Sequence, residues 1–290
     1  MPLELRWLIQ PQVTAFYAAG LIAGDPAASH PLLAALAEPS QALLAACRDC
    51  KVDFDPLLDA LMCYSAADNT PVGVLTERAL ADSTDPAASR HAAQLAPLVA
   101  ALLEALAASQ PQLAAELALR FLPLREQWEA RGPGLWRQLA RLTEPAAFVE
   151  RAAVLPVSPV QGGGGRALIA YNSVALEAVL ANPRSELPEV ARLAWLLALL
   201  NRDLARYRQP SVDLERVWPL ATIPPVLAAA AEVELARFEL ASLELALSHW
   251  QPQAQHTPEL AGVLLAWWQS YLEVRPSWAA ALAGLARMTA

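Results

Sequence analysis

The sequence predicts a predominantly helical protein of the α+β class, with many helices around a small β-hairpin or three-stranded sheet near residues 152–180. The composition is 56% hydrophobic and 17% charged, and it is rich in alanine and leucine, which favour helices. Only the stretch around residues 151–180 combines β-branched residues with a run of glycines, which is typical of strands and turns. We therefore expect a helical region at 1–145 and a mixed region at 146–290, or one continuous domain.

Asp-Pro pairs divide the N-terminal half into helices. Asp25-Pro26, Asp55-Pro56 and Asp85-Pro86 each place a capping carboxylate before a first-turn proline. Their constant spacing leaves open a helical-repeat scaffold, although the segment from Asp55 does not match its neighbours. Arg131 to Gly134 contains two glycines and a proline, which predicts a sharp turn. The expected helices cover 31–37, 40–50, 56–66, 75–81 and 86–108, the last with a kink at Pro97.

The strand-like region reads as a hairpin around four glycines. Val154 to Val160 and Arg166 to Tyr171 would be its strands, with Gly162 to Gly165 as the connection. Pro156 has no N–H for a ladder, so the first strand is expected to be an edge strand or irregular. Ser173 to Leu180 fits either a third strand or a helix, because short apolar runs do not distinguish the two.

Helices are expected again after residue 188. Pro188 to Leu200 is apolar almost all round, which predicts a buried helix. Pro224-Pro225 should open a long helix, Val226 to Trp250, in which Glu232 and Glu239 share one face. The other expected helices are a short one capped by Ser211 and ending at Trp218, one capped by Thr257 and ending at Val274, and a last one from about Ser277.

Charge and cysteine usage exclude several classes of partner. The formal charge is −8 and no basic cluster stands out, so we expect no nucleic-acid and no membrane partner. The three cysteines cannot all pair within one chain, and the N-terminus lacks the pattern of a signal peptide, which favours the cytoplasm. Abundant alanine, arginine and proline is typical of a bacterial protein from a GC-rich genome.

The cysteines themselves suggest no chemistry. Cys47 and Cys50 form a C-x-x-C, but they fall at the C-terminal end of a predicted helix, where the helix dipole disfavours a thiolate. A structural zinc ion needs four ligands, and a fourth is lacking beside Cys47, Cys50 and Cys63. We therefore expect three small buried apolar residues, no metal and no cofactor.

A ligand pocket could form around the glycine loop. Its backbone N–H groups, with Arg166 as counter-charge, could hold an anion, although neither G-x-x-x-x-G-K-[ST] nor G-x-G-x-x-G is present. The alternative is a flexible hairpin loop. The glutamates of the expected helix Val226 to Trp250 could close this pocket. The alternative is that they pair with arginines of neighbouring helices. The candidate ligand-binding residues are Gly163, Gly164, Arg166, Tyr171, Asn172, Glu177, Arg192, Glu232 and Glu239.

The sequence lacks the catalytic motifs that we searched for, and this favours a non-catalytic function. We find no H-E-x-x-H, no E-x-x-H and no G-x-S-x-G. The leading hypothesis is therefore a non-catalytic interaction or structural protein, with a protein partner or self-association. The rival is an enzyme or small-molecule binder with a pocket between the Gly162–Gly165 loop and the helices at 188–204 and 226–250. This hypothesis would fail if Glu232 and Glu239 point to solvent.

The order of elements resembles the layout of small H-E-x-x-H metallopeptidases. A glycine-rich strand region, further strands, a buried helix and a helix with glutamates follow one another in both. The motif would fall at Arg192 to Leu200, which contains neither histidine nor glutamate. The resemblance therefore implies a degenerate metallopeptidase-like domain that has lost its zinc site.

Overall fold

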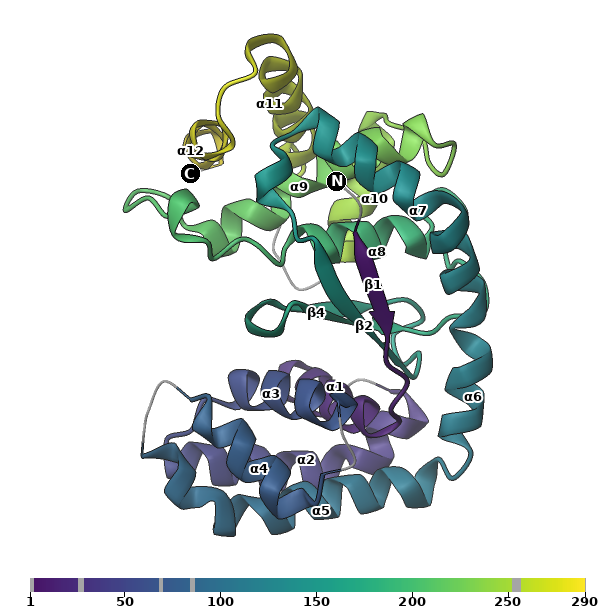
Figure 1. Cartoon of the computed structure of the whole chain (residues 1–290), viewed down its shortest axis with the longest axis vertical. Coiled ribbons are helices and arrows are strands. Elements are labelled where there is room, and N and C mark those ends of the chain that lie inside the picture. Colours follow the sequence, from purple (N-terminus) through teal and green to yellow (C-terminus); the bar gives the residue numbers. More distant parts are fainter. Residues whose placement is uncertain (1–2, 26–28, 68–69, 84–86, 252–256, 290) are drawn as a thin grey trace.

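The computed structural model consists of two helical layers with a small β-sheet between them (Figure 1). It describes residues 3–25, 29–67, 70–83, 87–251 and 257–289. The predominantly helical α+β class is confirmed. The lower layer is built from the first half of the chain and the upper layer from the second half, and α6 and α7 run from one to the other along one side of the molecule (Figure 1).

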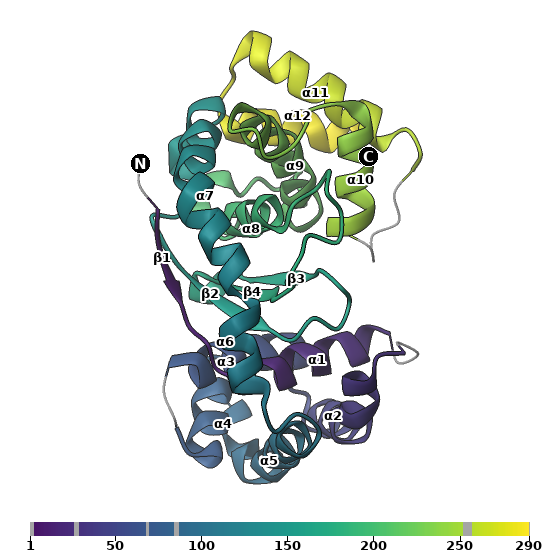
Figure 2. The ribbon, with the colours of Figure 1, turned by 90° about the vertical axis from the view of Figure 1, so that its right-hand side faces the viewer.

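The sheet has four strands in the order β1-β2-β4-β3, one more than the three-stranded sheet expected (Figure 2). β1 and β4 each pair with β2 in parallel, and β3 pairs with β4 antiparallel. The N-terminal strand was missed because four residues give too short a pattern to detect. The strands are β1 (Glu4–Trp7), β2 (Arg151–Val157), β3 (Gly165–Leu168) and β4 (Ser173–Glu177).

The predicted hairpin across the glycine loop is wrong, because β2 pairs with β1 and β4 and never with β3. β2 is therefore central and not an edge strand. Pro156 is tolerated there because alternate residues of a strand direct their backbone groups to opposite sides. Val154 accepts a hydrogen bond from Leu8 on the β1 side, whereas Val157 accepts one from Ala178 on the β4 side. Pro156 thus faces the β1 side, beyond the end of β1. The segment after Asn172, left open above, is the strand β4.

The lower layer contains longer helices than the sequence predicted. The expected helices 31–37 and 40–50 form a single helix, α2, which continues through Pro39. His30 caps it, accepting from the N–H of Leu32 at Nδ1, and Lys51 ends it in a left-handed conformation. Parts of the first and third Asp-Pro segments, residues 26–28 and 84–86, lie outside the described residues. The helices are α1 (Gln12–Gly24), α2 (Pro31–Cys50), α3 (Phe54–Ala67), α4 (Val72–Ala81), a 3-10 turn (Ala88–His91) and α5 (Ala92–Ser109).

The connecting and upper helices depart most from the sequence prediction. α6 and α7 follow the lower layer, and α7 passes through the predicted turn at Arg131 to Gly134 without a break. The sheet residues follow α7, and a buried helix comes next, as expected. The elements are α6 (Leu113–Arg120), α7 (Leu122–Leu142), α8 (Glu189–Ala198), α9 (Leu214–Glu232), α10 (Leu240–Trp250), α11 (Leu260–Val274) and α12 (Trp278–Met288), with short 3-10 turns at Pro145–Ala147, Ile169–Tyr171 and Ala205–Tyr207.

Prolines misled the prediction because tertiary packing keeps several of them inside helices. Pro224 and Pro225 do not open a helix but lie buried within α9, which Asp213 caps in place of the expected Ser211. The carbonyl of Pro219 accepts from the indole N–H of Trp195. The predicted long helix Val226–Trp250 is wrong: α9 ends at Glu232, and α10 begins only at Leu240.

The sheet separates two hydrophobic cores. Val154 and Val174 belong to the upper core, whereas Leu155 and Ala175 belong to the lower one, as the alternation of a strand requires. Outside the strand region at 151–180, the buried residues of the lower core end at Phe121 and those of the upper core begin at Leu124. The expected division of the chain into two regions near residue 145 stays a prediction.

Ala88–Ser109, which ends in α5, is long and apolar enough to cross a membrane by length and composition, and it is the one such helix among the described residues. In the structure, α5 packs against α2 and α4, and its buried residues include Leu95, Val99 and Leu102.

Candidate functional site

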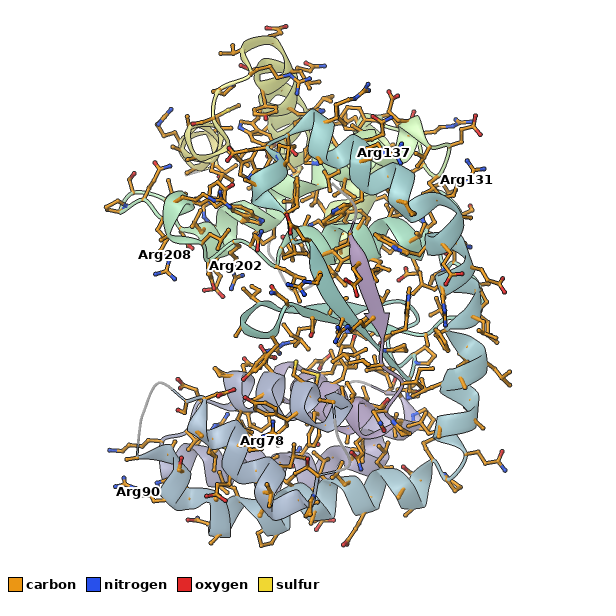
Figure 3. The ribbon with its side chains drawn as sticks, viewed as in Figure 1. Arg78, Arg90, Arg131, Arg137, Arg202 and Arg208 are labelled. Carbon is orange, nitrogen blue, oxygen red and sulfur yellow. The ribbon has the colours of Figure 1, made fainter. Side chains whose placement is uncertain are left out.

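A cleft between the two helical layers follows the edge strand β3. It consists of two adjoining cavities, one of about 750 Å³ and one of about 1050 Å³. The layer below contributes residues of α3, and the layer above contributes residues of α8 and the segment after it. Arg202, which lines both cavities, lies on the side of the molecule opposite α6 (Figure 3). The residues common to both cavities are Asp55, Gly165, Arg166, Arg202 and Glu215.

The glycine-rich loop folds around a carboxylate of the protein itself. Glu177, at the end of β4, is fully buried. Its Oε1 accepts from the N–H groups of Val160 at 3.1 Å and Gln161 at 2.9 Å, and its Oε2 accepts from the N–H of Gly163 at 2.8 Å. Backbone N–H groups that converge in this way form an anion-binding concavity. The anion considered from the sequence is thus replaced by the carboxylate of Glu177 in the protein itself.

Close packing explains the glycines of this loop. Gly163 has φ +121°, a conformation that side chains rarely adopt, and a Cβ there would lie 3.1 Å from Glu189 Oε1. A Cβ on Gly164 would lie 2.9 Å from the hydroxyl of Tyr17. A Cβ on Gly165 would lie 2.8 Å from the carbonyl oxygen of Ala175. The loop is thus held tightly by its surroundings, which does not fit the flexible hairpin considered above.

A buried ion pair adjoins this loop on the side of α8. Arg192 Nε lies 3.1 Å from Glu189 Oε2, one helical turn away, and both side chains are almost fully buried. Arg192 Nη1 also donates to the carbonyl of Gly163 at 2.8 Å. Tyr17 completes the cluster from α1, with its hydroxyl 3.4 Å from Glu177 Oε1. The glycine loop, β4 and helices of both layers therefore meet at one polar site.

Burial changes the proton affinities of this cluster. Desolvation raises the pKa of Glu189 to about 7 in spite of Arg192, and the Glu177 carboxylate adds to the rise. Desolvation, with the neighbouring Glu177, also holds the pKa of Tyr17 well above its usual value. Glu189 therefore titrates near neutral pH in the folded protein.

We expect Glu189 to make the protein less stable as the pH rises from about 4.5 to 7. Its pKa is about 7 when folded and 4.5 ordinarily, so in this window the folded state holds a proton that the unfolded chain has lost. Its stabilising contribution is complete below this window and is lost as the pH rises through about 7. The whole change is about 3 kcal/mol. Urea unfolding followed by tryptophan fluorescence across this pH range would measure it.

The Glu189→Gln variant is the control for this pH dependence. Glutamine cannot titrate, so the variant should lose most of the decline in the free energy of unfolding. Part of the decline should remain in the variant because of Asp59, whose pKa is raised to about 6 by desolvation. An equal decline in the variant and the wild type would contradict the assignment to Glu189.

Arg166 connects β3 to the lower layer. Its guanidinium lies 3.0 Å from Asp55 Oδ1 and 2.8 Å from Asp59 Oδ1, both on α3. Close by, the hydroxyls of Tyr64 and Tyr171 both donate to Asp82 Oδ2, at 2.5 Å and 2.8 Å. These contacts hold the β3 side of the sheet against α3 and the end of α4.

The structure brings six of the nine candidate residues to the cleft or its wall. Gly163, Gly164, Arg166, Tyr171 and Arg192 line the cavities, and Glu177 lies directly behind the glycine loop. The other three are Asn172, Glu232 and Glu239.

The remaining three candidates lie elsewhere. Asn172 is exposed in a left-handed turn between β3 and β4. Glu232 ends α9 and Glu239 precedes α10, so they share no helix face. Both are exposed, and neither lines a cavity described above. A pocket closed by these two glutamates, as the sequence suggested, is therefore not formed.

Three residues of the site were missed. Tyr17 and Asp59 lie on helices far from the glycine loop in sequence, and no local pattern marks them. Glu189 could have been found, because it and Arg192 are charged residues one turn apart in an otherwise apolar helix, and buried charges need partners.

The C-x-x-C lies where the sequence predicted, but only Cys47 is buried, whereas Cys50 and Cys63 are partly exposed. α2 ends at Cys50, so the C-x-x-C lies at the C-terminal end of its helix. All three cysteines are free, Cys47 is buried, and desolvation raises the pKa of Cys47 and Cys63 to about 12. Within the described part of the chain, no three histidine, cysteine, aspartate or glutamate side chains are grouped to hold a metal ion.

Comparison of the chain with protein-family models, with curated proteins and with solved structures gives no match.

Proposed function

We propose that the protein binds an extended peptide segment of a partner protein, which adds to the sheet at β3 inside the cleft. The observation that carries this proposal is the outer edge of β3. This edge pairs with no strand of the described chain and lies in the wall of both cavities. Such strand addition gives affinity through backbone hydrogen bonds and specificity through pockets for alternate side chains. The proposal keeps the interaction function that the sequence favoured and locates it in the cleft beside the glycine loop.

The pairing of β3 with β4 determines which backbone groups are available. The N–H of Glu177 donates to the carbonyl of Gly164 at 2.9 Å, and alternate residues of an antiparallel pair bond in this way. Arg166 and Leu168 therefore face β4. Gly165 and Ala167 direct their N–H and C=O groups to the outer edge, where the described chain has no pairing strand.

The cleft offers pockets on both faces of an added strand. Below the β3 edge, the smaller cavity is lined by Leu57 and Leu80 of the lower layer. Above it, the same cavity is lined by Leu199 and Trp195, whose ring stacks on Trp250 with centroids 5.3 Å apart. Because the side chains of a strand alternate between its faces, successive residues of a bound peptide would enter these apolar pockets in turn.

The Ala167→Pro variant is expected to lose peptide binding while it stays folded. Proline removes the outward N–H of Ala167 and none of the hydrogen bonds to β4, and edge strands tolerate proline. The ligands would be selected from a random peptide library displayed on phage, and their affinities measured by fluorescence anisotropy. Loss of this one backbone hydrogen bond is expected to weaken binding up to about tenfold. Unchanged affinity in a folded variant would contradict strand addition.

N-methylated peptides give a matched control on the ligand. In an added strand, alternate N–H groups point toward β3 and away from it. Methylation of one alternate set of a selected peptide should abolish binding, whereas methylation of the other set should leave most of it. Equal effects of the two sets would show that the peptide does not bind as a strand.

A further inference from the structure

The two cavities along β3 have opposite charge. The smaller cavity has far more carboxylates than guanidiniums in its wall, and among the described residues its cations are Arg166 and Arg202. Arg166 already forms ion pairs with two aspartates of α3. The acidic residues of this wall are Asp53, Asp55, Asp59, Asp82, Asp203 and Glu215. We call this the acidic cavity.

The larger cavity has the reverse balance. Four guanidiniums line it, against the carboxylates of Asp55 and Glu215. Three of the four are ion-paired within the protein, whereas Arg48 forms no ion pair with the described residues. Arg192, 6% exposed, is the buried member of this set. The arginines are Arg48, Arg166, Arg192 and Arg202, and His249 lies in the same wall. We call this the basic cavity.

Each cavity contains an exposed charge that the fold leaves without a counter-ion. Asp53 precedes α3 and lines the acidic cavity, whereas Arg48 near the end of α2 lines the basic one. Both are exposed, and neither side chain forms an ion pair with the described residues. These two groups can meet a charged ligand without breaking an internal contact.

The direction of β3 sets the order of these charges along the cleft. The basic cavity borders the start of β3 and the glycines before it, Gly163 to Arg166. The acidic cavity borders the rest of β3 and the turn after it, as far as Tyr171. A strand advances about 3.3 Å per residue, so a few residues of peptide reach from one cavity to the other.

On the basis of the proposed strand addition, we infer that the bound segment runs antiparallel to β3, with basic residues in its N-terminal half and acidic residues in its C-terminal half. Antiparallel pairing is the more stable arrangement and already joins β3 to β4. An antiparallel segment enters at the acidic cavity and ends at the basic one, so this charge order pairs each half with its opposite.

Two blocked peptides of equal composition test this inference. The forward peptide alternates valine with arginine in its first half and with glutamate in its second, and the reversed peptide has the opposite order. A third peptide replaces the charged residues by threonine. The forward peptide should bind the full-length protein about tenfold more tightly than the reversed one. Salt should reduce the difference, because exposed charges are screened.

Variants that remove a charge test whether the two cavities cause the tighter binding of the forward peptide. The double variant Asp53→Asn with Asp203→Asn, and separately Arg48→Gln, should each weaken the forward peptide roughly threefold or more and leave the threonine peptide unchanged. Glu104→Gln removes an exposed charge outside the cleft and should change neither affinity.

The outcomes distinguish this inference from the proposed function beneath it. Equal affinities for the forward and reversed peptides, or tighter binding of the reversed one, would overturn the charge order while strand addition stands. Failure of all three peptides and of every library peptide to bind would overturn both. Tighter binding of the forward peptide that is lost in the charge variants would support both.

Discussion

The Glu177→Gln variant is expected to unfold at a clearly lower urea concentration than the wild type, with a loss of about 3 kcal/mol. Glutamine has nearly the shape of glutamate but replaces one acceptor oxygen by a donor. The carboxylate now accepts three backbone N–H groups from the glycine loop. In the variant, at least one of these buried donors would face another donor, which costs the full desolvation of that group.

Urea unfolding at constant pH measures this effect, and an unchanged m value would show that the folded state keeps its compactness. Glu104→Gln, an exposed residue of α5, is the matched control and should change stability by less than about 0.5 kcal/mol. A Glu177→Gln protein as stable as the control would show that the loop does not depend on this carboxylate.

The Gly165→Ala variant should lose about 2 kcal/mol of stability and also bind peptides more weakly. A Cβ on this residue would lie 2.6 Å from Leu196 Cδ1 and 2.8 Å from the carbonyl oxygen of Ala175. The leucine can rotate, but the carbonyl belongs to the paired strand β4. β3 must therefore shift, and the edge that we propose for strand addition shifts with it.

A second glycine provides the comparison. Gly262, exposed in α11, has nothing within 4 Å of its Cβ position, so Gly262→Ala should raise stability by up to about 1 kcal/mol. Thermal unfolding of both variants would show the opposite signs. Combining Gly165→Ala with Leu196→Ala should recover only the part of the lost stability that comes from the clash with the Leu196 side chain. Equal shifts for the Gly165 and Gly262 variants would refute the close packing of β3.

The candidate site was predicted in part because some of its signals are local. Four successive glycines indicate unusual backbone conformations, and the structure gives Gly162 and Gly163 positive φ angles. Arg192 in an apolar helix predicts a buried partner, but the partner is Glu189 of the same helix and not a glutamate of the predicted long helix. The sequence did not reveal that Glu177 occupies the loop, because the loop precedes β3 and Glu177 follows it. No local pattern relates two segments that a strand separates.

The sequence by itself determined the helical class, the buried helix α8 and the position of the C-x-x-C at a helix end. These features depend on composition and on the spacing of residues within one segment. Tertiary structure alone decided that residues 4–7 join the sheet and that β2 is central. It also decided that α7 and α9 continue through their prolines. The physical reason is that these outcomes depend on contacts between distant segments, whose packing energy outweighs the local preferences of proline and glycine.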